Sequence, residues 1–172
     1  PKVYAKPDIT RNKQGMVTIA SADQELELFY TTDGTAPNIN SKRYEAPFEL
    51  LEKADVKAIA LDPITGKESP ISSENFDIAR KKWQLINIDD ENAQSVLDGL
   101  EKTSWGQSSD QMPIDLTIDL GEDLNLKGFK YLPDQNRWSS GIIFDYEFYT
   151  STHGKSWKLQ NKGEFSNIKN SR

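Results

Sequence analysis

Apolar and polar residues alternate in short runs along this chain of 172 residues, and turn-forming residues follow the runs. Residues 25–30 place Leu26, Leu28 and Tyr30 on one face, and the turn dipeptide Asp33-Gly34 comes directly after them. A period of two is typical of a half-buried strand, and no long amphipathic helix competes with this interpretation. The pattern therefore predicts an all-β chain of short strands, as in β-sandwiches.

The charged stretch 79–82 separates two groups of expected strands. Residues 55–61 and 71–78 are predicted strands before it. After it we expect strands at 83–88, 113–120, 126–132 and 144–150, one more beginning at Trp157, and a short helix at 92–97 with Asp90 as its N-cap. Alternation in the strand at 113–120 predicts a core face, and Trp157 is also expected in the core. The residues of that face are Ile114, Leu116, Ile118 and Leu120.

Composition excludes several classes of function. The net charge of −6 disfavours nucleic acid as a partner, and no apolar run reaches the roughly 20 residues that span a bilayer. With no cysteine there are no disulfides or thiolate metal sites, and a single histidine, His153, rules out a multi-histidine zinc site. His153 is interpreted as a turn residue. None of the 27 acidic residues lies in a recognisable catalytic context, so no catalytic residue is predicted.

The first half carries a recognisable set of motifs. Residues 29–35 are Phe-Tyr-Thr-Thr-Asp-Gly-Thr, Pro37, Tyr44 and Pro47 follow, and residues 56–60 are Val-Lys-Ala-Ile-Ala. In this order they resemble the small immunoglobulin-like domain appended to bacterial chitobiases and β-hexosaminidases. The resemblance predicts an Ig-like β-sandwich over residues 1–79.

The second half carries another set, including Leu97-Asp98-Gly99, Ile118-Asp119-Leu120-Gly121 and Gly154-Lys155-Ser156-Trp157. It resembles the coagulation-factor type C, or discoidin, domain, whose bacterial branch includes the family 32 carbohydrate-binding modules. The resemblance predicts a discoidin-type (galactose-binding-like) β-sandwich over residues 80–172. Because such domains normally end with one or two further strands, we expect this one to be truncated at its C-terminus and to lack its last strands.

The order of the two domains resembles the tail of exported Bacteroides-type glycoside hydrolases, either chitobiase-like β-N-acetylhexosaminidases or α-L-fucosidases. This implies a non-catalytic accessory region with a catalytic domain upstream in the same protein. It also implies a periplasmic, outer-membrane-associated or extracellular location in a bacterium. The expected function is to target the enzyme to glycans with terminal sugars such as galactose, N-acetylglucosamine or fucose. The alternative is a purely structural spacer that braces the catalytic domain and has no affinity for sugar.

The loop 134–141 contains the residue types that bind sugars. A pyranose stacks its C–H patches on an aromatic ring and bonds its hydroxyls to amides and charged groups. We therefore predict that Trp138 stacks on a sugar and that Arg137, Asn136 and Gln135 bond its hydroxyls, with Trp105 as a further candidate at the rim. The alternative is a Trp138 folded over the edge of the sandwich, with Arg137 paired to an acid.

Residues 98–103 resemble the loop that binds calcium in many discoidin modules. The resemblance implies that Asp98 supplies its carboxylate, Thr103 its hydroxyl and carbonyl, and Ser95 and Leu100 their carbonyls. Calcium takes roughly six to eight oxygen ligands, of which backbone carbonyls supply several. Such a Ca²⁺ ion would be structural. A structural loop without metal is the alternative.

Overall fold

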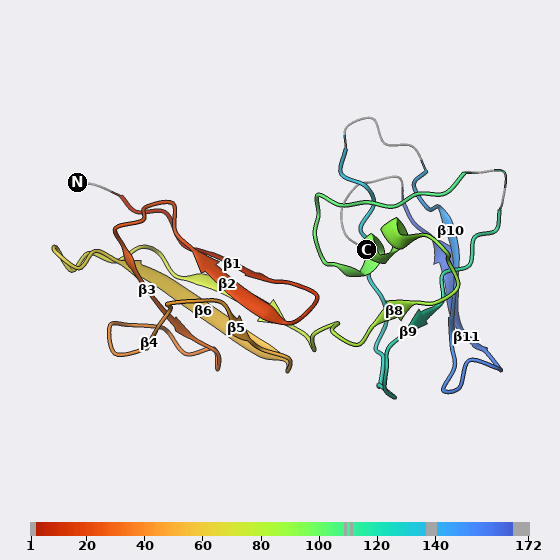
Figure 1. Cartoon of the computed structure of the whole chain (residues 1–172), viewed down its shortest axis with the longest axis horizontal. Helices are drawn as coiled ribbons and strands as arrows, with labels where there is room; N and C mark the ends of the chain where they lie inside the picture. The colour runs from red at the N-terminus through yellow and green to blue at the C-terminus, as the bar shows by residue number, and fades with distance from the viewer. Residues whose placement is uncertain (1–2, 109, 111, 137–140, 167–172) are drawn as a thin grey trace. The chain divides into compact units, whose positions relative to one another are not determined.

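The computed structural model describes residues 3–108, 110, 112–136 and 141–166. Its backbone divides into two compact units, Pro1–Lys81 and Lys82–Arg172, which are treated separately below (Figure 1). In the described part, eleven strands and one short 3₁₀ helix make up the regular structure. The predicted all-β class is confirmed.

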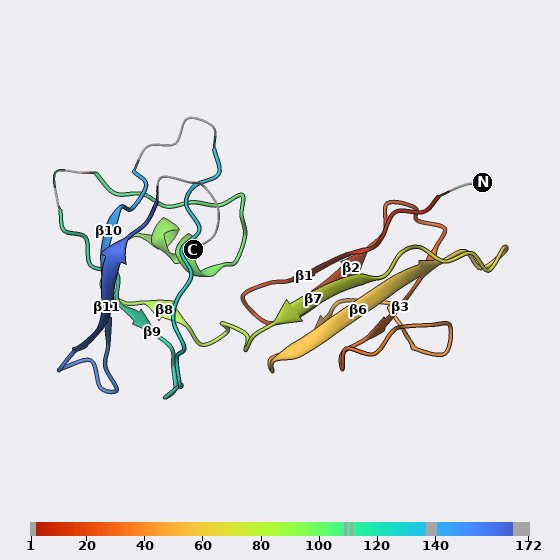
Figure 2. The same ribbon diagram turned by 180° about the vertical axis from the view of Figure 1, so that it is seen from behind.

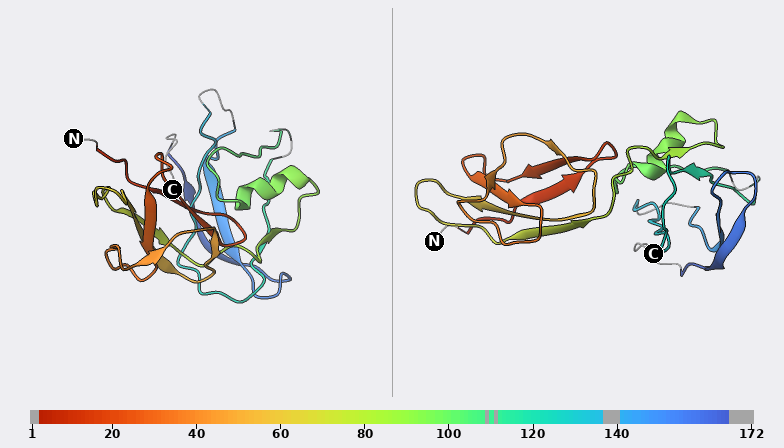
Figure 3. Two further views of the ribbon diagram at one scale, coloured as in Figure 1. Left: turned by 60° about the vertical axis from the view of Figure 1, so that its left-hand side comes forward. Right: turned by 90° about the horizontal axis from the view of Figure 1, so that it is seen from below.

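The first unit is a sandwich of two antiparallel sheets, which Figures 1 and 2 show from its two sides and Figure 3 from below. One sheet has the order β1-β2-β5, and the other has the order β4-β3-β6-β7. The strands are β1 (Asp8–Arg11), β2 (Met16–Ala20), β3 (Glu27–Thr31), β4 (Lys42–Arg43), β5 (Phe48–Glu49), β6 (Ala54–Leu61) and β7 (Ser72–Phe76).

Both sheets contribute to the main core of this unit. Val17 and Ile19 of β2 meet Tyr30 of β3 and Val56 and Ala58 of β6 in one buried cluster. The ring of Tyr30 also stacks on Phe48 of β5, with centroids 4.6 Å apart. Burial of this apolar area is the main force that holds the two sheets face to face.

The strands β3 and β6 have buried residues on both faces of their sheet. Phe29 alternates with Leu28 and Tyr30 along β3, and it packs with Ile59 and Leu61 of β6 in a second cluster on the other face. The expectation of a half-buried strand at residues 25–30 is therefore wrong for Phe29. The charged neighbours of the apolar residues suggested an exposed face, but the register with β6 places Ile59 directly opposite Phe29.

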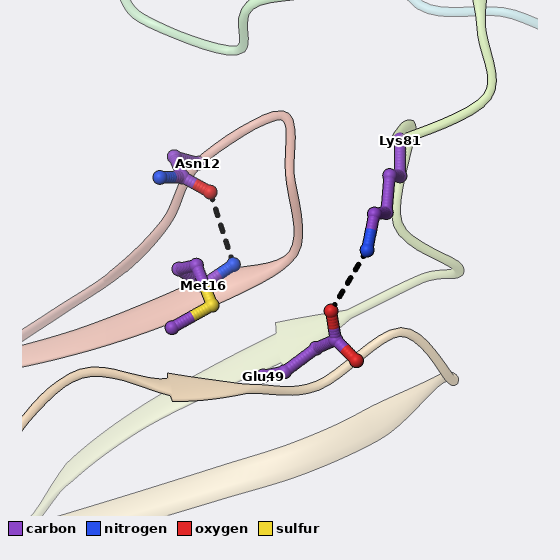
Figure 4. Close-up of polar contacts among 4 residues, drawn as sticks. All are labelled: Asn12, Met16, Glu49 and Lys81. Atoms are coloured by element: carbon purple, nitrogen blue, oxygen red, sulfur yellow. Dashed lines mark hydrogen bonds and ion pairs between the residues drawn. The ribbon is translucent and has the colours of Figure 1, made fainter.

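Turns and terminal contacts close the first unit. Gly34 adopts φ of 79° in the turn after β3, a conformation that glycine tolerates, and its N–H donates to the Asp55 carbonyl oxygen at 2.9 Å. The Asn12 side-chain oxygen accepts the Met16 N–H at 3.0 Å in the β1–β2 turn (Figure 4). Lys81 forms an ion pair with Glu49 at 2.9 Å, which ties the end of this unit to β5 (Figure 4).

The described part of the second unit contains two antiparallel strand pairs and the 3₁₀ helix. The pair β8 (Gln84–Leu85) and β9 (Ile118–Asp119) is short, whereas β10 (Asp145–Thr150) and β11 (Lys158–Glu164) form the long pair visible in Figure 2. The helix η1 (Glu91–Leu97) packs against β8. Its Ala93 and Leu97 bury Leu85, and three further residues cover this cluster: Trp83, Ile88 and Trp105.

The start of η1 follows the sequence prediction. Asp90 is the N-cap, and its side chain accepts the Asn92 N–H at 2.9 Å. Gln94 then anchors the helix to β8, because its amide donates to the Leu85 carbonyl at 2.9 Å and accepts the Leu85 N–H at 3.3 Å. The cap and this anchor fix the chain that leads into η1.

An aromatic cluster lies beside β10. The rings of Tyr146 and Phe165 stack at 4.4 Å, those of Phe129 and Phe148 stack at 4.7 Å, and Tyr131 lies 5.0 Å from Phe165. Phe129 and Tyr131 belong to residues 126–132, which were predicted as a strand but form none. Ring contacts hold this segment in place of a ladder of backbone hydrogen bonds.

Two further predictions for this unit are wrong. Residues 113–120 form a strand only at Ile118–Asp119, and Leu116 and Ile118 are 41% and 38% exposed although they were expected in a core. Trp157 precedes β11 but is 48% exposed. In the first of these segments the alternation marks an apolar face, but no other layer of the described structure buries that face.

Candidate functional site

A polar surface hollow of about 450 Å³ lies in the second unit, at the start of η1. Two segments line it: residues 87–90, which lead into the helix, and residues 105–108, which follow the loop after the helix. We call it the Trp105 hollow. Its lining combines one large aromatic ring with carboxylate, amide and hydroxyl groups.

Asp90 and Trp105 form the centre of the hollow. The indole Nε1–H of Trp105 donates to Asp90 Oδ2 at 2.8 Å, while Oδ1 of the same carboxylate accepts the helix-capping bond from Asn92. The hydrogen bond from Trp105 is the main cause that lowers the pKa of Asp90 below its ordinary value, and the bond from Asn92 adds to it. The carboxylate therefore stays ionised at neutral pH. Trp105 also packs against the Leu85 cluster, which leaves its ring half-buried and fixed in orientation.

The other polar groups of the hollow differ in the hydrogen bonds that they form within the protein. Asn87 donates to the Asp115 carbonyl and accepts the Thr117 N–H, both at 2.7 Å, so its amide braces the β9 segment. Ser108 hydrogen-bonds the Asp110 carboxylate and thereby lowers the pKa of Asp110. Asp89 is exposed, and its carboxylate accepts no hydrogen bond from any residue that the structure describes.

Comparison with protein families accounts for both units. Residues 72–172 match the family model of the F5/8 type C domain, which is more than half of the chain. The chain belongs to the F5/8 type C domain family. Residues 17–76 match a second model, described as Fn3 associated. No curated protein matched the chain. Within the described residues, no helix is long and apolar enough to cross a membrane.

The predicted resemblance to the discoidin domain is thus confirmed. Both matched families are non-catalytic, which agrees with the prediction of a non-enzymatic region. The chitobiase-like relationship of the first unit and the hydrolase upstream stay predictions.

The sugar-binding loop predicted at 134–141 is described only in part. Gln135 donates from Nε2 to the Pro133 carbonyl at 2.6 Å. Asn136 donates from its backbone N and from Nδ2 to Asp134 Oδ1, each at 2.9 Å. Arg137 and Trp138 lie outside the described residues, so their roles stay predictions. Of the three predicted sugar-binding residues that the structure describes, Trp105 lines the hollow, whereas Gln135 and Asn136 do not.

The loop predicted to bind calcium brings oxygen atoms together within the F5/8 type C domain. Thr103 Oγ1 lies 2.7 Å from Asp98 Oδ2 and 3.0 Å from the Leu100 carbonyl oxygen. The Ser95 carbonyl accepts the Asp98 N–H at 3.3 Å, and Ser95 Oγ is buried without a hydrogen-bond partner. As possible metal ligands these atoms fit calcium, because all of them are oxygens. They include a single carboxylate, and no group of three acidic or histidine side chains suited to a metal occurs in the described part of the chain.

Sequence reasoning missed several residues of the hollow. Asp90 was predicted only as a helix cap. No role was predicted for Asp89, Gln107 or Ser108. The bond between Asp90 and Trp105 joins residues 15 positions apart, and no local pattern specifies such a contact. His153 is a turn residue as predicted, because its Nδ1 accepts the Lys155 N–H at 3.1 Å.

Proposed function

We propose that this chain is a non-catalytic, carbohydrate-binding accessory region and that the Trp105 hollow takes part in binding the sugar. Its family supports this, because F5/8 type C domains are commonly carbohydrate-binding modules. The hollow is open to solvent, which suits a terminal sugar held weakly.

The observation that carries the proposal is the fixed indole of Trp105 in a polar hollow. The Asp90 carboxylate holds the ring by its N–H, and the core cluster supports it from within the unit. A ring whose orientation is set before binding loses little conformational freedom when a sugar stacks on it. Asp89 and Gln107 line the same hollow and carry groups that recognise sugar hydroxyls.

The finer proposal concerns the protein around this region. The order of an Ig-like unit and a discoidin unit supports an accessory role in a chitobiase-like β-N-acetylhexosaminidase or an α-L-fucosidase exported by a bacterium. The partners would be the upstream catalytic domain and glycans ending in galactose, N-acetylglucosamine or fucose. A Ca²⁺ ion bound by Asp98 and Thr103 would be structural, since that loop leads directly to Trp105.

A purely structural spacer is the second candidate. The observation that favours it is the packing of Trp105 against the Leu85 cluster, since a tryptophan that completes a core needs no ligand to explain it. In that case the hollow would be no more than the surface above a small core.

A glycan array of the chain, in calcium and after chelation, separates the two candidates. We expect binding of a terminal sugar that Trp105→Ala and Gln107→Ala both weaken, while Trp157→Ala, which removes an exposed tryptophan outside the hollow, leaves it unchanged. Trp138→Ala tests the predicted loop in the same experiment. Near-UV circular dichroism of each variant shows whether it is folded.

An array on which the folded wild-type chain binds nothing would leave the spacer as the function. Binding that persists in a folded Gln107→Ala variant and in Trp105→Ala, but is lost in Trp138→Ala, would move the sugar site from the hollow to the 134–141 loop.

A further inference from the structure

Among the residues that the structure describes, the charges that line the Trp105 hollow all have one sign. Asp89 and Asp90 contribute carboxylates, and neither segment of the lining contains a lysine, arginine or histidine. Asp110 adds a third carboxylate next to the hollow through its hydrogen bond to Ser108. A concave surface lined by charges of one sign raises the local concentration of the opposite sign.

The two carboxylates at the start of η1 differ in whether their oxygen atoms already accept hydrogen bonds. Asp90 is committed, because one of its oxygens caps the helix and the other holds Trp105. Asp89 is exposed and accepts no hydrogen bond in the described structure. A cationic ligand in the hollow would therefore form its ion pair with Asp89 and not disturb the cap.

Trp105 adds a second preference for a cation. The only hydrogen-bond donor of its side chain, Nε1–H, is used by Asp90, which leaves the π system of the ring to interact with a ligand. The face of tryptophan attracts an ammonium group more strongly than the other aromatic side chains do. A carboxylate beside such a ring is a combination that recognises alkylammonium groups.

From this juxtaposition we infer that the Trp105 hollow prefers an amino sugar with a free, protonated amine over the N-acetylated or neutral sugar of the same ring. The inference rests on the proposed function, because it assumes that the hollow binds sugar. The ring would stack on Trp105 while its ammonium group pairs with Asp89. Anionic sugars such as uronic acids would be repelled by the same carboxylates.

The test is a nuclear magnetic resonance titration that follows the indole N–H signal of Trp105, assigned by its loss in Trp105→Phe. The probes are the β-1,4-linked disaccharides of glucosamine, N-acetylglucosamine and glucose, together with glucuronate, at a mildly acidic pH that keeps the amine protonated. A lysine derivative blocked at both backbone ends offers the same ammonium group without a sugar.

We expect the glucosamine disaccharide to bind about fivefold more tightly than its N-acetylated form at low salt, the size of a partly exposed charge interaction. Added salt and Asp89→Asn should each bring this ratio towards one. The matched control is Asp123→Asn, which removes an exposed carboxylate that does not line the hollow and should keep the ratio. Glucuronate should give no shift.

Three outcomes overturn the inference in different ways. Equal affinity for the free and the acetylated amine would refute it and leave the proposed function intact. No shift with any sugar, from folded protein, would refute both. A lysine derivative that binds as tightly as the amino sugar would show that the hollow recognises ammonium groups on proteins and not sugars.

Discussion

Asp90 joins two parts of the second unit through one carboxylate. It caps η1 through the Asn92 N–H and holds the indole of Trp105, so the entry to the helix and the wall of the hollow depend on the same side chain. A carboxylate that accepts two bonds in the folded state has a lower pKa there than in the unfolded chain. Folding stability must then depend on pH at this position.

We predict that Asp90→Asn lowers the urea midpoint of unfolding at neutral pH, although asparagine is also a good N-cap. Because folding lowers the Asp90 pKa below its ordinary value of 3.8, the stabilisation is fully present above that value and is lost as the pH falls through the folded-state pKa. The difference between wild type and variant should therefore shrink below pH 3.8. Urea titrations followed by tryptophan fluorescence measure it.

Asp89→Asn is the control for this prediction. It changes the neighbouring carboxylate, which accepts no hydrogen bond among the described residues, and it should leave the urea midpoint close to that of wild type. If the urea midpoint of Asp90→Asn stayed below that of wild type by the same amount from neutral to acidic pH, the charge of Asp90 would contribute nothing to folding stability.

At the scale of elements, β6 is the strand on which the first unit depends. It pairs with β3 on one edge and β7 on the other, and its side chains enter both buried clusters. We predict that Ile59→Ala, at a side chain only 1% exposed, destabilises the first unit by about 2–4 kcal/mol, through lost burial and the cavity left behind.

Ile64→Ala is the matched control, because it removes the same atoms from a side chain that is 92% exposed in the turn after β6. It should change stability by less than about 0.5 kcal/mol. Both values come from urea unfolding followed by far-UV circular dichroism. Equal effects of the two substitutions would mean that β6 is not a core strand.

The sequence predicts those elements whose local pattern and tertiary partners agree. Expected strands at 55–61, 71–78 and 144–150 are confirmed as β6, β7 and β10, and the helix at 92–97 with its Asp90 cap is confirmed as η1. Alternation alone fails at 113–120, since it shows that one face is apolar but not whether another layer covers that face. The hollow escapes prediction for a related reason: the hydrogen bond between Asp90 and Trp105 joins residues 15 positions apart, and Trp105 is supported by packing against the Leu85 cluster.

At the scale of the whole molecule, the two units have cores of very different size. Two clusters with nine buried residues hold the first unit. In the described part of the second unit, a single cluster contains three buried residues, Leu85, Ala93 and Leu97. Hydrophobic stabilisation grows with the apolar area removed from water, so the second unit should be the less stable one.

The distribution of tryptophan allows this to be measured directly. All four tryptophans lie in the second unit, at positions 83, 105, 138 and 157, so tryptophan fluorescence reports on that unit alone, whereas far-UV circular dichroism reports on both. We predict that urea unfolds the chain in two steps, with the fluorescence transition at the lower concentration. Ile59→Ala should move only the later, circular-dichroism step and leave the fluorescence midpoint in place. One transition seen by both probes, shifted as a whole by Ile59→Ala, would instead mean that the two units unfold as one cooperative body.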